Sequence, residues 1–129
     1  MQFELDFNSD KSIYIQIEEN IIKSIAKGDL KIGDSLPSVR NMAENIGVNL
    51  HTANKAYNSL KDKGYLNIDR RKGAIVSDLP LKKNSDSEKN LYSELEIFIC
   101  NAFLSGISKE EFIDFSKKIY NECEVIKND

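Results

Sequence analysis

The stretch from Leu36 to Leu66 reads LPSVRNMAENIGVNLHTANKAYNSLKDKGYL. Its apolar residues recur at i, i+3, i+4 and i+7 on both sides of Gly47, which predicts two short amphipathic helices joined by a glycine turn. The two apolar stripes are Val39, Met42, Ala43 and Ile46, and Ala53, Ala56, Tyr57 and Leu60. This pattern is typical of a helix-turn-helix, whose second helix enters the major groove of DNA.

The second predicted helix is polar at its N-terminal end, outside the apolar stripe. The side chains there are of types that hydrogen-bond to base edges or to phosphates. The expected DNA contacts on this helix are Asn49, His51, Thr52, Asn54 and Lys55. The alternative for Asn54 and Lys55 is a solvated surface, and His51, the only histidine, lacks the partners that a metal site needs.

Two residues at the start of the first predicted helix extend this candidate interface. Ser38 follows Pro37 and is the expected N-cap. Arg40 projects off the apolar stripe, where it either pairs with Glu44 at i+4 or contacts guanine or phosphate. We include both Ser38 and Arg40 among the expected DNA contacts.

A β-hairpin with a basic tip is predicted directly after the second helix. Residues 65–69 and 74–77 alternate like strands, and the turn between them contains a glycine that can take a positive φ. On a helix-turn-helix, such a hairpin would be a wing that reaches the phosphate backbone or the minor groove. The alternative is an ordinary charged turn. The expected DNA contacts in the turn are Arg70, Arg71, Lys72 and Gly73.

The net charge of −3 at pH 7 is unevenly distributed along the chain. Residues 1–47 carry −3, residues 48–78 carry +3 and residues 79–129 carry −3. The positive segment contains the second helix and the basic turn, so the local charge favours a nucleic-acid partner although the whole chain is acidic.

Three features are expected before the helix-turn-helix. The alternation of apolar and polar residues over positions 3–7 predicts a short, half-buried strand. An isoleucine at every fourth position from Ile13 predicts a helix that ends at Gly28 and has Glu18 on its solvent face. In the loop after this helix, three apolar residues are expected to pack on the core: Leu30, Ile32 and Leu36.

After a linker over residues 79–84, the pattern predicts a hairpin of two amphipathic helices. Ser108 and Glu111 form a capping box for the second helix. The apolar faces are too broad for the pair to bury alone, so they need the first domain or another subunit. The apolar positions are Leu91, Tyr92, Leu95, Phe98, Ile99, Ala102 and Phe103, followed by Phe112, Phe115, Ile119, Cys123 and Ile126.

The composition argues against several other classes of protein. The chain of 129 residues is 40% hydrophobic and 30% charged, with no apolar run of membrane-spanning length and no secretory signal. Cys100 and Cys123 lie in apolar patterns and are expected to be buried free thiols, and we expect no metal and no cofactor. Without a secretory signal or a membrane span, the protein is expected to be cytoplasmic. Because catalytic motifs are also lacking, we expect that it is not an enzyme.

Several short pieces of residues 13–78 occur in an order that matches a known family. The pieces are Ile13-Tyr14-Ile15-Gln16-Ile17, Gly28-Asp29-Leu30, the run from Gly33 to Arg40, Gly47-Val48-Asn49, and Ala56-Tyr57 with Leu60 and Gly64. They resemble the DNA-binding domain of GntR-family transcriptional regulators. The resemblance implies a winged helix that binds a near-palindromic operator as a dimer. It also implies DNA contacts from Arg40, from the start of the second helix and from the wing turn at Gly73.

Residues 80–129 are too few for the large ligand-binding or aminotransferase-like domains that most members of this family carry. The chain looks like the short YtrA-type subfamily, whose small helical C-terminal region serves in dimerisation and whose members often act on transporter operons. Whether a small-molecule effector binds in the helical hairpin is left open.

We therefore predict a mainly α-helical protein with a small β wing. A winged helix-turn-helix DNA-binding domain is expected over residues 1–79, and a small α-helical dimerisation region over residues 80–129. The expected function is sequence-specific transcriptional regulation by a homodimeric repressor that binds a palindromic operator in double-stranded DNA, without a membrane partner. The alternative is a winged-helix adaptor that binds proteins and does not read DNA, against which the basic turn argues.

Overall fold

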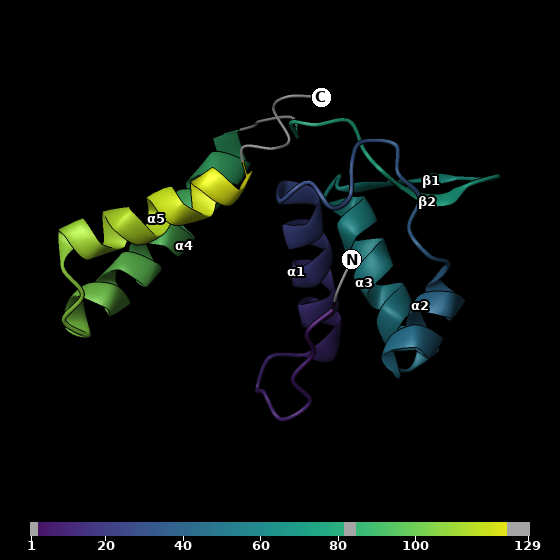
Figure 1. Ribbon diagram of the computed structural model, residues 1–129, viewed down its shortest axis with the longest axis horizontal. Coiled ribbons are helices and arrows are strands. Elements are labelled where there is room, and N and C mark those ends of the chain that lie inside the picture. The colour runs from purple at the N-terminus through teal and green to yellow at the C-terminus, as the bar shows by residue number, and fades with distance from the viewer. Residues whose placement is uncertain (1–2, 82–84, 124–129) are drawn as a thin grey trace. The chain divides into compact units, whose positions relative to one another are not determined.

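The computed structural model describes residues 3–81 and 85–123, and the chain divides into two compact units, residues 1–81 and 82–129. Figure 1 shows the helices of the first unit gathered beside its small sheet, and a second unit that is helical. The predicted fold, mainly α-helical with a small sheet, is confirmed. The elements are α1 (Ile13–Ala26), α2 (Val39–Ile46), α3 (Leu50–Asp62), β1 (Leu66–Asp69), β2 (Gly73–Val76), α4 (Ser85–Leu104) and α5 (Lys109–Cys123).

The core of the first unit is formed by the apolar stripes of its three helices. α3 packs against both α1 and α2, because its small residues Ala53 and Ala56 let the neighbouring helices approach closely. The predicted helix-turn-helix is confirmed, and α2 ends at Gly47, whose φ of 71° suits a residue without a Cβ. The buried apolar residues are Ile17, Ile21, Ile25, Leu30, Leu36, Met42, Ala43, Ala53, Ala56, Tyr57, Leu60, Leu66, Ala74 and Val76.

The two strands form the predicted antiparallel hairpin, with Leu66 opposite Val76 and Asp69 opposite Gly73. The loop before α2 adds backbone hydrogen bonds to β2: Leu36 N–H donates to the Ala74 carbonyl (2.8 Å), and Val76 N–H donates to the Asp34 carbonyl (2.9 Å). Since Leu66 and Val76 are also buried, the base of the hairpin is fixed to the helical core and only its tip projects.

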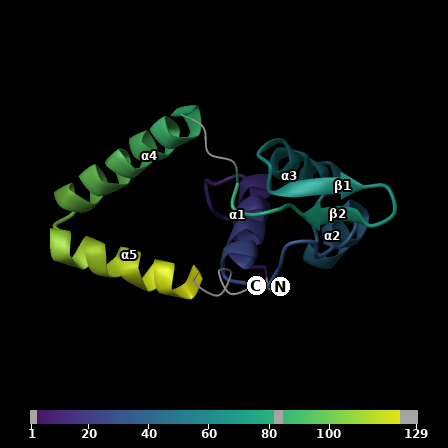
Figure 2. The same cartoon turned by 90° about the horizontal axis from the view of Figure 1, so that it is seen from above.

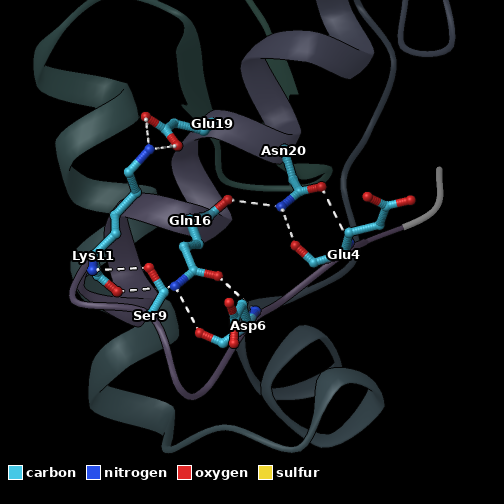
Figure 3. A network of polar contacts seen from close by, with 7 residues as sticks. All are labelled: Glu4, Asp6, Ser9, Lys11, Gln16, Glu19 and Asn20. Atoms are coloured by element: carbon cyan, nitrogen blue, oxygen red, sulfur yellow. Dashed lines mark hydrogen bonds and ion pairs between the residues drawn. The ribbon is translucent and has the colours of Figure 1, made fainter.

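The strand predicted over residues 3–7 is wrong. In the N-terminal strap (residues 3–11), the backbone pairs with side-chain amides of α1 instead of with another strand (Figure 3). Asp6 N–H donates to Gln16 Oε1 (2.8 Å) and Gln16 Nε2 donates to the Asp6 carbonyl (3.0 Å), while Asn20 makes the same two bonds with Glu4 (3.2 Å each). Phe3 and Leu5 are half-buried and Glu4 and Asp6 are exposed, as the alternation predicts, but Phe7 is 63% exposed. Alternation of apolar and polar residues does not identify the hydrogen-bonding partner.

Two further side chains of the first unit lie elsewhere than predicted. Glu18 is only 4% exposed and not on a solvent face, because Lys63 Nζ reaches its Oε1 at 3.3 Å from the C-terminal end of α3. Ile32 is 46% exposed, whereas Leu30 and Leu36 are buried as expected. The reason is a tight turn in which the Asp34 carboxylate accepts from Lys31 N–H (2.8 Å), which turns Ile32 outward.

The second unit is the predicted helical hairpin. Its capping box is confirmed, since Glu111 N–H donates to Ser108 Oγ (3.1 Å) and Ser108 N–H donates to Glu111 Oε1 (3.3 Å). Figure 2 shows α4 and α5 meeting at their turn and separating toward their other ends. The packing between them is therefore slight.

No residue of α4 or α5 that the structure describes is buried. Cys100 is exposed and Cys123 half-buried, both with free thiols, so the predicted burial of the cysteines is wrong within one chain. Ile126 lies outside the described residues. The large exposed apolar side chains of the pair are Leu91, Tyr92, Leu95, Ile97, Phe98, Ile99, Phe103, Leu104, Ile113, Phe115, Ile119 and Tyr120.

Candidate nucleic-acid interface

The N-terminal end of α2 presents Ser38 and Arg40. Ser38 Oγ accepts a hydrogen bond from Asn41 N–H (3.1 Å), so Ser38 is the N-cap of α2, as predicted. Arg40 is exposed, and in the part of the chain that the structure describes no ion pair joins it to Glu44. The guanidinium is therefore directed to solvent, where a ligand with acceptor groups can meet it.

The junction of α2 with α3 is held by two hydrogen bonds. The Tyr57 hydroxyl donates to the Pro37 carbonyl at 2.6 Å, and burial raises the pKa of Tyr57 above its usual range. Val48 N–H donates to the Ala43 carbonyl (3.0 Å) directly after the turn. These contacts fix α3 with respect to the start of α2, so that side chains on both helices are presented by a rigid support.

The first turn of α3 carries most of the predicted contacts. Asn49 is the N-cap, and its Oδ1 accepts from His51 N–H (2.7 Å), which leaves the amide nitrogen of Asn49 as its outward donor. His51 and Asn54 are exposed, whereas Thr52 is half-buried. A polar helix end with several free donors and acceptors matches the chemistry of base edges and phosphates.

Lys55 has a partner that the sequence pattern did not reveal. Its Nζ lies 4.1 Å from the centroid of the Tyr14 ring on α1, a cation–π contact. Lys55 also lines a shallow groove of about 440 Å³ along the outer face of α3. The groove is lined by His51, Asn54, Lys55, Asn58, Ser59, Asp62 and Lys63.

The turn between β1 and β2 presents three exposed cations, Arg70, Arg71 and Lys72. The Asp69 carboxylate organises this turn, since it accepts from Arg71 N–H (2.7 Å) and from Lys72 N–H (3.0 Å). These backbone hydrogen bonds, together with the nearby charge of Lys72, lower the pKa of Asp69. Sequence reasoning missed Asp69, although an aspartate directly before a charged turn is a known turn signal.

The predicted residues thus form three groups: the start of α2, the outer face of α3 and the β1–β2 turn. Among the residues described, no hydrogen bond or ion pair joins one group to another. Within residues 3–81 and 85–123 there is also no cluster of side chains suited to a metal ion. None of the helices in that part of the chain is both long and apolar enough to span a bilayer.

A three-helix unit with a two-stranded hairpin, a polar α3 and a basic hairpin tip is a winged helix-turn-helix, a DNA-binding class of domain. Comparisons with known proteins agree. The model of the family described as "Bacterial regulatory proteins, gntR family" matches residues 13–76. The HTH-type transcriptional repressor YtrA of Bacillus subtilis is 31% identical over 117 residues, which is 90% of each chain.

Two solved structures are similar over 93% of this chain. The transcriptional antiterminator from Listeria monocytogenes EGD-e has a TM-score of 0.84 at 26% identity, with 93% of that chain covered. YtrA from Sulfolobus acidocaldarius, a GntR-family transcription factor, has a TM-score of 0.58 at 38% identity, with 97% covered. The present chain belongs to the GntR family of bacterial regulatory proteins. It is a DNA-binding transcriptional regulator of the short YtrA type, and its homologues are regulators and not enzymes.

Proposed function

We propose that this protein is a homodimeric repressor that binds a near-palindromic operator. The observation that carries the proposal is the division of its exposed surface. In the first unit, α2, α3 and the β1–β2 turn expose polar and cationic side chains, whereas α4 and α5 expose apolar ones. The first surface suits a polyanion with base edges, and the second suits a protein surface of the same apolar character.

On DNA, the three groups of side chains have different tasks in this proposal. Arg40 and the first turn of α3 contact base edges and adjoining phosphates in the major groove. The turn contacts phosphates, because cations at a hairpin tip add affinity without reading sequence. The proposed DNA contacts are Ser38, Arg40, Asn49, His51, Thr52, Asn54, Lys55, Arg70, Arg71, Lys72 and Gly73.

The helical hairpin provides the proposed dimer contact, and residues 80–129 form the dimerisation region. A pair of helices with no buried residue among those described gains little stability by itself, and a second copy would cover its apolar face. Two-fold symmetry would then place two copies of α3 one duplex turn apart, about 34 Å, on equivalent half-sites.

Repression is proposed because the Bacillus subtilis relative YtrA, matched over 90% of both chains, is named a repressor. The resemblance to the YtrA-type subfamily adds a transporter operon as the proposed target. A regulator of chromosomal genes acts in the cytoplasm, which is the location we propose. Membership in a DNA-binding family also favours this function over a protein-binding adaptor.

The test is DNase footprinting with duplexes from the promoter that precedes the gene, combined with the mass of the complex in solution. We expect protection of two symmetric half-sites and a stoichiometry of two chains per duplex. Protection of one half-site by a single chain would refute the dimeric arrangement. Binding that does not distinguish the promoter from a scrambled duplex would refute operator recognition.

A further inference from the structure

The helix α1 makes two polar contacts with α3 from positions one helical turn apart. Tyr14 lies under the ammonium group of Lys55, with 4.1 Å from Nζ to the ring centroid. The Glu18 carboxylate, four residues later, accepts a 3.3 Å hydrogen bond from Nζ of Lys63, the C-cap of α3. Helical geometry puts positions i and i+4 on one face, so a single face of α1 holds one lysine of α3 and the lysine that caps it.

The two partners act differently on the charge of the lysine. The Glu18 carboxylate neutralises the charge of Lys63. An aromatic ring attracts the ammonium group through its quadrupole and carries no net charge of its own. Lys55 is therefore oriented by Tyr14 while it keeps its full positive charge, and its side chain is exposed on the groove along α3.

A lysine contact with phosphate normally requires a long, flexible side chain to be ordered on binding. The Tyr14 ring orders Lys55 before DNA arrives, which reduces that loss of rotamer entropy. It also draws the ammonium group toward α1, so we assign it to the phosphate backbone and not to base edges. Phosphate contacts carry no sequence information of their own.

We infer that Tyr14 is a positioning residue of the DNA interface, which acts by holding Lys55 in the orientation that meets a phosphate. This inference rests on the proposed DNA-binding function of α3. It adds a residue from outside the helix-turn-helix to that interface. It also assigns Lys55 to a phosphate contact, which adds the same affinity for every DNA sequence.

The test is a double-mutant cycle on duplex binding with Tyr14→Leu, Lys55→Ala and the double variant. Tyr14→Leu should weaken operator binding about two- to fivefold, the range expected from an exposed cation–π contact. In the Lys55→Ala background the same change should have no further effect. Lys55→Ala should weaken binding to operator and scrambled duplexes by the same factor. It should also reduce the slope of log K against log salt by the amount that corresponds to about one phosphate contact.

Two variants separate this role from a purely structural one. Tyr14→Phe keeps the ring and should bind like the parent protein. Glu18→Gln loosens the other contact between the same two helices and should leave the affinity within about twofold. A loss in Tyr14→Phe as large as in Tyr14→Leu, a loss of that size in Glu18→Gln, or additive effects in the cycle would each overturn the inference.

Failure of this inference is distinct from failure of the proposed function. If the parent protein protects its promoter and the cycle is additive, only the role of Tyr14 is lost. If the parent protein protects no duplex, the proposed function fails first. Circular dichroism of every variant confirms that the compared proteins are folded.

Discussion

The two units of this chain differ in what they leave exposed to water. The first unit buries the apolar faces of three helices, so that few of its large apolar side chains are exposed, and its cations gather on α3 and the β1–β2 turn. In the hairpin α4–α5, the free surface carries large apolar side chains and no described residue is buried. The difference supports the proposal that the units have partners of different chemistry: a polyanion for one and an apolar protein surface for the other.

The largest effect is expected from one leucine truncation in each unit. Leu60 is 0% exposed and Leu91 is 67% exposed. Leu60→Ala should cost about 2–5 kcal/mol of the free energy of unfolding at any protein concentration. Leu91→Ala should have an effect that depends on protein concentration, because its cost arises in the dimer. Urea unfolding at two protein concentrations measures both effects. If both variants lost the same free energy of unfolding at both protein concentrations, the proposed difference between the two units would be wrong.

A charge placed on the apolar face of α4 should dissociate the proposed homodimer. Phe98 is 64% exposed in one chain, so Phe98→Glu should not disturb the packing within a hairpin. In the dimer the same change buries an unpaired charge and should cost roughly 2–4 kcal/mol of dimer affinity. Sedimentation equilibrium measures it, with Ser93→Glu on the same helix as the matched control. A Phe98→Glu protein that remains dimeric would exclude this face as the interface.

On the polar unit, Arg40→Ala should cost about 1–3 kcal/mol of operator affinity and relax sequence preference. The reason is the loss of a planar, bidentate donor that faces solvent in the free protein. Fluorescence anisotropy with operator and scrambled duplexes provides both values. Arg40→Lys keeps the charge and loses the planar fork, so a normal preference in that variant would assign Arg40 to phosphate contact instead of base reading.

The cations of the β1–β2 turn should contribute to the affinity for DNA without contributing to sequence preference. Replacing both Arg71 and Lys72 with alanine should weaken binding to all duplexes and reduce the slope of log K against log salt by about 0.9 for each lost phosphate contact. The matched control is Lys117→Ala on α5, whose slope should be that of the parent. A selective loss on the operator alone would show that the turn reads bases.

The smallest expected effect concerns the turn at low pH. The pKa of Asp69 is lowered from 3.8 in the folded state by the two backbone hydrogen bonds it accepts. Its contribution to the turn is therefore fully present above pH 3.8 and is lost as the pH falls below that value through the lowered pKa. The protection of the Arg71 and Lys72 amides, taken as the ratio of the intrinsic to the observed exchange rate at each pH, should fall over this range. The Asp69→Asn protein has no group to titrate there and should show no such step.

The elements that depend on local periodicity could be predicted from the sequence. The stripes of α2 and α3 and the presence of the hairpin follow from spacing, and the caps at Ser38 and Ser108 follow from residue type. These signals extend over a few residues, and each describes one face of one element.

The contacts that depend on distant partners could not be predicted in this way. Glu18 is buried because Lys63 lies beside it 45 positions later in the chain, and Tyr14 meets Lys55 across two helices. The strap was expected to be a strand because alternation carries no information on what supplies the hydrogen bonds. For the DNA contacts, the sequence indicates which side chains are available, and binding experiments must assign their tasks.

The strap on α1 has a consequence for the way this protein responds to its ionic surroundings. Gln16 accepts from the N–H and donates to the carbonyl of Asp6, and Asn20 does the same with Glu4, a complementarity that neither a carboxylate nor an ammonium group supplies. Because no net charge takes part in these amide pairs, salt screens them little, whereas it weakens contacts with phosphates strongly. We therefore expect a rise in ionic strength to weaken the contacts with DNA more than the amide pairs that hold the strap to α1.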